Sequence, residues 1–157
     1  MKPLLNCLYI FFLIICIPVN AQKNINLTSP DGNISFSFKL VNKTMNYNVA
    51  FKQKKLIDNS SLGLQFENDN FNSNLKIKKP VYRDTTEDYD LVVGKTSHVH
   101  THYKEVTIPL EETATPFRKI NFIVRIFNDG LAFRYQIPEQ INFLSFTLLD
   151  ELSLIHI

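Results

Sequence analysis

The sequence predicts an all-β fold, an antiparallel β-sandwich of about eight strands. Short apolar runs alternate with polar residues, which is the period of strands with one buried face. Turn-forming residues separate these runs, and no stretch of about ten residues shows a helical period. The 157 residues are about one domain's length, and a hydrophobic content of 45% excludes a disordered chain.

The first part of the sandwich is predicted to be a series of hairpins. Residues 29–32, Ser-Pro-Asp-Gly, form a tight turn, because proline and glycine suit the backbone of such turns. The following elements come from period-two alternation and the polar residues between the runs: a strand over 34–40, a turn over 41–44, a strand over 47–51, a turn over 53–55 and a short strand over 62–66.

Residues 67–90 are polar and rich in Asn, Asp and Lys. They predict a long loop that carries one or two edge strands, with an apolar piece at Leu75 and Ile77. Alternation returns over 106–110 and predicts a further strand.

The clearest element is a hairpin over residues 120–135. Apolar residues alternate on both sides of Asn128-Asp129-Gly130, a turn whose glycine is expected to accept the positive φ of tight hairpins. Ile123 and Phe127 fall on the opposite face from the main apolar row. This hairpin is therefore expected to be covered on both sides.

Residues 1–21 are predicted to be a secretory signal peptide. An apolar run over 4–19 is too short to span a bilayer, and cleavage is expected after Ala21. Both cysteines, Cys7 and Cys16, lie in this segment, so the mature chain has neither disulfides nor thiolate chemistry. We expect a secreted or periplasmic chain with no membrane attachment after cleavage.

Composition excludes several functions. Lys+Arg 17 against Asp+Glu 15 gives a net charge of only +2, which makes nucleic acid a poor candidate partner. The four glycines are widely separated, so neither a glycine-rich phosphate loop nor a nucleophile elbow can form.

Three alternating histidines, His98, His100 and His102, are the most conspicuous candidate site. Residues two apart share a face of a strand, so three imidazoles could converge on a metal such as zinc. The alternative is that they are solvated or lie at an interface, because no carboxylate is spaced as an obvious partner. We expect the second arrangement and assign no metal ligand.

Paired carboxylates for glycoside hydrolysis need a separation of roughly 5–10 Å across a pocket. We expect Asp129 to serve its turn, Glu105 to be an exposed strand residue and 111–112 to be a solvated strand end. Arg125 and Arg134 are expected to pair with acids on a neighbouring strand. The carboxylates considered, none of which is assigned a catalytic role, are Glu105, Glu111, Glu112, Asp129 and Glu139.

Several segments, in this order and spacing, resemble the N-terminal domain of glycoside hydrolase family 97, a family of secreted α-glucosidases and α-galactosidases typical of Bacteroidetes. The resemblance assigns residues 22–152 to a partial N-terminal domain. Residues 153–157 leave the pattern, so the chain is expected to stop inside the sandwich. The segments that carry the resemblance are 29–32, 61–64, 93–95, 102–105, 127–135 and 137–140.

The resemblance implies a larger parent enzyme with an N-terminal β-sandwich, a central (β/α)8 barrel and a C-terminal β domain. The resemblance implies that the catalytic carboxylates lie on the barrel. It also implies a calcium ion in the active site, with one ligand from the N-terminal domain in a segment beyond the last residue matched here. This chain is therefore expected to hold neither catalytic nor metal residues, and to shape the barrel's pocket for an α-linked oligosaccharide. Glucoside or galactoside specificity and an inverting or retaining mechanism stay open. The alternative is a free-standing carbohydrate-binding or structural β-sandwich.

Overall fold

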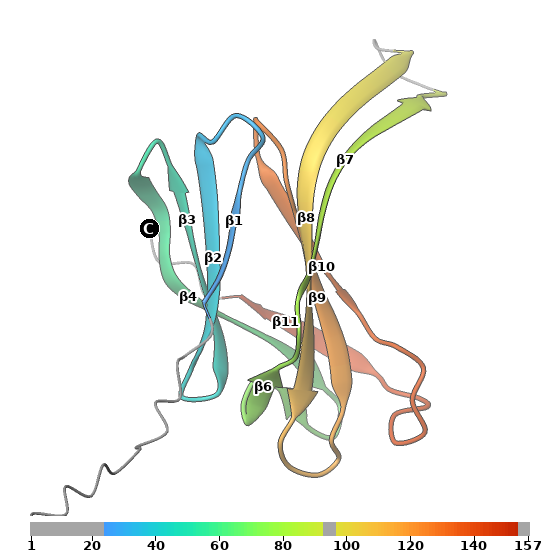
Figure 1. Cartoon of the computed structure of the whole chain (residues 1–157). Coiled ribbons are helices and arrows are strands. Elements are labelled where there is room, and N and C mark those ends of the chain that lie inside the picture. Colours follow the sequence, from blue (N-terminus) through green and yellow to red (C-terminus); the bar gives the residue numbers. More distant parts are fainter. Residues whose placement is uncertain (1–23, 93–96, 154–157) are drawn as a thin grey trace, which may run out of the picture.

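The computed structural model describes residues 24–92 and 97–153. The predicted signal segment, residues 93–95 and the end of the tail lie outside these ranges. Two antiparallel sheets face each other across one core (Figure 1), which confirms the predicted all-β sandwich. Within the described ranges no helix is long and apolar enough to cross a membrane.

The first sheet has the order β1-β2-β3-β4-β11, with β5 also paired to β4. Type I′-like hairpins join β2 to β3 and β3 to β4, since both residues of each turn have positive φ. The second turn lies at Lys52 and Gln53 rather than over 53–55, because Lys54 already pairs with Phe51. The strands are β1 (Ile25–Thr28), β2 (Ile34–Val41), β3 (Thr44–Phe51), β4 (Lys54–Phe66), β5 (Asn70–Phe71) and β11 (Leu148–Ser153).

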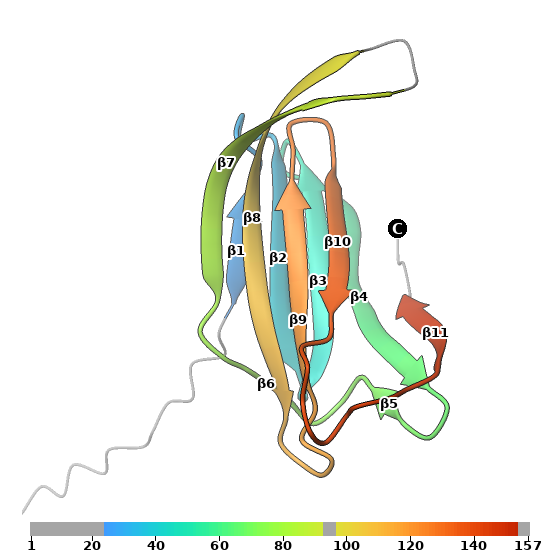
Figure 2. The ribbon, with the colours of Figure 1, turned by 90° about the vertical axis from the view of Figure 1, so that its right-hand side faces the viewer.

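The second sheet has the order β10-β9-β8-β6, and β7 also pairs with β8. The long strand β8 pairs with β6 near its C-terminal end and with β7 over its first ten residues. Together β7 and β8 extend past the end of the sandwich as a two-stranded ribbon (Figure 2). The strands are β6 (Leu75–Ile77), β7 (Val81–Asp90), β8 (His98–Glu112), β9 (Lys119–Ile126) and β10 (Leu131–Gln136).

The segment over 67–90 contains edge strands, as predicted, but most of it is not a loop. β7 alone is ten residues long, and nearly all its side chains are exposed. A strand exposed on both faces shows no alternation of polar and apolar residues, so the period-two criterion could not find it.

The predicted hairpin over 120–135 is present, with Leu131 paired to Ile126. Its turn differs in detail from the expectation. Gly130 does not adopt a positive φ, and the loop is closed by a hydrogen bond from the Phe127 N–H to the Gly130 carbonyl at 2.8 Å. Ile123 is buried on the outer face of β9 and Phe127 is half-buried, but the outward side chains of β10 are exposed, so the predicted cover on both sides holds only for β9.

Aromatic side chains join the two sheets in the core. Phe38 of β2 lies 5.4 Å from Phe122 of β9, and Tyr47 of β3 lies 6.1 Å from Phe133 of β10, between ring centroids. β10 is an edge of its sheet, and Phe133 and Tyr135 are only half-buried. The Tyr135 hydroxyl is nevertheless buried and has no hydrogen-bond partner among residues 24–92 and 97–153, and this burial raises the pKa of Tyr135.

Candidate functional site

The three alternating histidines lie on one face of β8, in the part that forms the projecting ribbon. Their side chains are exposed, as expected, and each is bonded to a carboxylate on β7. No group of three or more potential ligands is placed to hold a metal ion within residues 24–92 and 97–153. The pairs are His98 Nδ1 with Asp90 Oδ1 at 2.8 Å, His100 Nδ1 with Asp88 Oδ1 at 2.5 Å and His102 Nε2 with Asp84 Oδ1 at 2.6 Å.

Glu105 is buried, which corrects the expectation of an exposed strand residue. The Arg125 Nε donates to Glu105 Oε2 at 2.7 Å, and this hydrogen bond raises the pKa of Arg125. The same guanidinium lies 4.4 Å above the Tyr103 ring, so it covers the outer face of the sheet at Glu105. The predicted pairing of Arg125 is confirmed. For Arg134, no ion pair is formed with any described residue.

Glu112 is also buried, which corrects the expectation of a solvated strand end. Its carboxylate accepts Arg118 Nη2 at 2.5 Å, Arg118 Nε at 2.9 Å and the Arg118 backbone N–H at 2.9 Å. Arg118 is 2% exposed and lies within 5.8 Å of three phenylalanine rings. Its neighbour Glu111 stays nearer the surface, where a hydrogen bond from Lys78 lowers the pKa of Glu111.

The carboxylates considered from the sequence therefore have structural partners or face solvent. Glu105 and Glu112 are each bonded to an arginine. Asp129 and Glu139 are exposed. Sequence reasoning missed Arg118, which follows a turn and belongs to no alternating run.

Two of the turns that carry the family resemblance meet at one end of the sandwich. The Asp31 backbone N–H donates to Asn128 Oδ1 at 3.0 Å, although the two residues are far apart in sequence. Within the first turn, Gly32 has a φ of 76° and the Ser29 hydroxyl donates to Asp31 Oδ1 at 2.5 Å. That hydrogen bond is the main cause that lowers the pKa of Asp31, and the Asn33 N–H adds to it.

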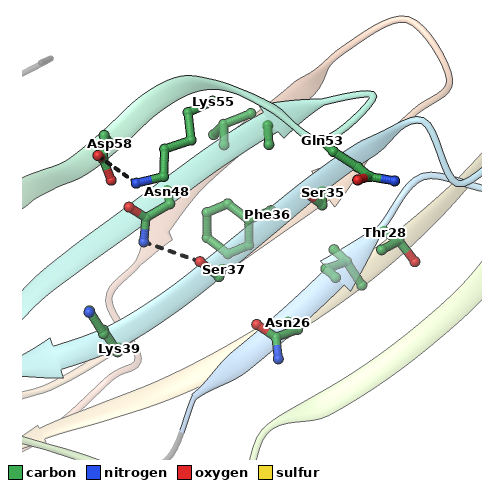
Figure 3. Close-up of a pocket in the computed structure, with 13 residues that line it drawn as sticks. Asn26, Thr28, Ser35, Phe36, Ser37, Lys39, Asn48, Gln53, Lys55 and Asp58 are labelled. Carbon is green, nitrogen blue, oxygen red and sulfur yellow. Dashed lines mark hydrogen bonds and ion pairs between the residues drawn. The ribbon is translucent and has the colours of Figure 1, made fainter. Parts of the chain in front are cut away.

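A hollow with a volume of about 570 Å³ lies on the outer face of the first sheet (Figure 3). Strand pairing places Asn26, Ser37 and Asn48 in one row across the sheet. A second row holds Thr28, Ser35 and Ala50. Because these side chains are short, the outer face of the sheet has a shallow depression at these two rows. We refer to this surface as the β1–β3 hollow; its side-chain lining is Asn26, Thr28, Ser35, Ser37, Lys39, Asn48, Ala50, Gln53, Lys55 and Asp58.

An irregularity in β4 forms one side of the β1–β3 hollow. The pairing of β3 with β4 shifts register around Val49, and Asn59 has a φ of 48°. The Asn59 N–H donates to Asn48 Oδ1 at 2.6 Å, which holds this bulge against the sheet. Lys55 and Asp58 lie on that side and pair at 2.7 Å, as Figure 3 shows.

Two facing antiparallel sheets with a shared aromatic core define a β-sandwich domain. More particularly, the chain belongs to the family described as Glycosyl-hydrolase 97 N-terminal, whose model matches residues 27–156. This match confirms the resemblance drawn from the sequence. It runs to residue 156, past the expected boundary at Leu152.

The similar proteins are much longer enzymes. A retaining alpha-galactosidase from Bacteroides thetaiotaomicron is 22% identical over 129 residues, which cover 79% of this chain and 18% of that protein. A glycoside hydrolase family 97 enzyme from Pseudoalteromonas sp. strain K8, solved in complex with panose, has a TM-score of 0.76 and 28% identity over 82% of this chain and 20% of its own. A beta-arabinopyranosidase structure has a TM-score of 0.73 and 26% identity, covering 81% of this chain and 20% of its own. The chain thus spans about a fifth of the length of these relatives and corresponds to an N-terminal domain of a family 97 glycoside hydrolase.

Proposed function

We propose that this chain is a non-catalytic part of a secreted glycoside hydrolase, and that it packs against a (β/α)8 barrel and shapes its active site. The observation that carries the proposal is the state of its two buried carboxylates. The oxygens of Glu105 and Glu112 are each hydrogen-bonded to an arginine, whereas the paired carboxyl groups of a glycosidase flank the scissile bond in a substrate pocket. The matched part is only about a fifth of each relative, which leaves room for the catalytic part elsewhere.

The substrate class of the parent enzyme is proposed to be an α-linked oligosaccharide. The support is that one relative is a retaining alpha-galactosidase and another was solved with panose. Export to the periplasm or medium is proposed from the signal-like pattern of residues 1–21. The calcium ion implied by the family resemblance is proposed to lie with the remainder of the enzyme, because the resemblance puts its N-terminal-domain ligand beyond the matched segment.

The test is an assay of the purified chain with nitrophenyl α-glucosides and α-galactosides. We expect no release of nitrophenol above the level of a preparation of Glu105→Ala, which removes the buried carboxylate on β8. Release that survives purification and disappears in Glu105→Ala would overturn the non-catalytic role.

A free-standing carbohydrate-binding sandwich is the second candidate, and the β1–β3 hollow is the observation that favours it. Sequencing the gene past the codon for Ile157 separates the two. An in-frame barrel sequence supports the enzyme part, and a stop codon supports the free-standing domain.

A further inference from the structure

We infer that the β1–β3 hollow binds a neutral oligosaccharide. The inference rests on the proposed function, because a glycoside hydrolase works where such sugars are present. Its volume of about 570 Å³ lies within the range of roughly 300–1,000 Å³ that is usual for small-molecule sites. Figure 3 shows its polar side chains on β1, β2 and β3, with Lys55 and Asp58 of β4 beside them.

The hydrogen-bonding groups of the hollow fit sugar hydroxyls. Hydroxyl and amide side chains both donate and accept, as each sugar hydroxyl does. Two internal pairs are already formed, Asn48 with Ser37 at 3.2 Å and Lys55 with Asp58 at 2.7 Å. The remaining polar side chains form no side-chain hydrogen bond with any described residue and are available to a ligand; they are Asn26, Thr28, Ser35, Lys39 and Gln53.

The charge of the hollow favours a neutral ligand over an anion. Lys55 is neutralised by Asp58, so Lys39 is the one cation of the lining without a carboxylate partner among the described residues. Phosphate recognition usually employs an arginine fork or several cations, and the lining has neither.

Apolar ligands and peptides fit the hollow less well. Leu27, Phe36 and Val49 reach its lining only marginally, since they point into the core and are 6%, 1% and 4% exposed. A peptide that extends a sheet needs an unpaired strand edge. Of the three strands, β2 and β3 are paired along both edges, so a peptide could extend the sheet only along the outer edge of β1, outside the face that forms the hollow.

Affinity is expected to be modest. Phe36 is the one aromatic residue of the lining, and its ring is buried, so a sugar cannot stack there. Binding by hydrogen bonds alone, each of which contributes a small net free energy in water, suggests a Kd on the order of 1 mM.

The test is a titration of the ¹⁵N-labelled chain with maltotriose and with raffinose, followed by amide chemical shifts. We expect saturable shifts of residues 26–28, 35–37 and 48–50. Ala50→Leu fills the floor without removing a hydrogen bond and should weaken binding by about tenfold or more. Asn26→Ala removes one exposed amide and should weaken it about two- to tenfold. Thr107→Ala, on the outer face of the other sheet, should leave the Kd unchanged.

Each contrary result overturns the inference. One such result is that no amide chemical shift changes at sugar concentrations about 50-fold above the expected Kd. Another is that the changes are centred on β8–β10, or are equally large with inorganic phosphate. The last is a Kd that neither Ala50→Leu nor Asn26→Ala changes. Absence of binding would leave the proposed function intact. Release of monosaccharide in the same sample would instead refute the non-catalytic role, so the two failures are distinguishable.

Discussion

The buried pair of Glu112 and Arg118 offers the sharpest test of the interior. Glu112→Gln keeps the shape of the side chain and removes its charge. In the variant, Arg118, which is 2% exposed, keeps one amide oxygen at residue 112, the Asn70 carbonyl at 3.1 Å and a single carboxylate, Asp69, at 3.1 Å. Breaking a buried ion pair costs about 3–5 kcal/mol, and because the exposed Asp69 still faces the guanidinium, we expect a loss in the free energy of unfolding at the lower end of that range.

The measurement is urea unfolding followed by far-UV circular dichroism, because the chain has no tryptophan. A double-mutant cycle with Arg118→Met separates the pair from its surroundings. The double variant should lose about 1–3 kcal/mol less than the sum of the single variants, since it buries no unpaired charge. Lys55→Ala is the control, because that side chain and Asp58 are 68% and 53% exposed and such pairs contribute about 0–1 kcal/mol.

Two results would refute this reasoning: a cost of Glu112→Gln no larger than that of Lys55→Ala, or additive losses in the cycle. Either would mean that water reaches the guanidinium. If Glu112→Gln is too unstable to purify, the free energies of unfolding of Arg118→Met and of the double variant still test the reasoning. The double variant is expected to be no less stable than Arg118→Met.

Three further predictions concern a turn, the histidines and the core. Because the pKa of Asp31 is lowered on folding, its ionised form stabilises the fold at pH values above the unfolded pKa near 3.8, and this contribution is lost as the pH falls through the folded pKa. Asp31→Asn should therefore flatten the acid side of a plot of Tm against pH, and an unchanged plot would contradict this. Saturating zinc should leave the Tm unchanged, and a rise of several degrees that His100→Ala abolishes would establish a metal site. Phe122→Ala should cost about 3–5 kcal/mol in urea unfolding, because Phe122 is fully buried against Phe38 and Phe133; a loss as small as that of Thr107→Ala would contradict the described core.

Local alternation predicted the hairpins of the sandwich because each depends on neighbours in sequence. β2 and β3 are joined by a two-residue turn, and β9 and β10 by a four-residue loop. Strand β7 was missed because the apolar period comes from one-sided burial, and β7 is exposed on both faces. The carboxylate partners of the three histidines were missed with it.

The two buried glutamates show different limits of sequence reasoning. Glu112 continues the inward row of β8 that holds Val106, Ile108 and Leu110, so the pattern itself contained the signal of its burial. Glu105 lies on the outward row, where Arg125 on β9, twenty residues away, bonds it and Arg83 on β7 lies 4.0 Å from its other oxygen. Contacts of that kind depend on strand register, which the alternation of a single strand does not specify.

The segments that carry the family resemblance are used mainly to hold the sandwich together. Asp31 in the Ser-Pro-Asp-Gly turn is bonded to Asn128 in the second turn, which fixes the ends of two facing sheets. Tyr103 and Glu105, in the segment over 102–105, contact the same Arg125 guanidinium. Residues with such roles identify a scaffold, because each is required by a turn or by a buried charge. They therefore predict the fold and the family without placing a catalytic group, and this agrees with our proposal that the chemistry of the parent enzyme lies outside the sandwich.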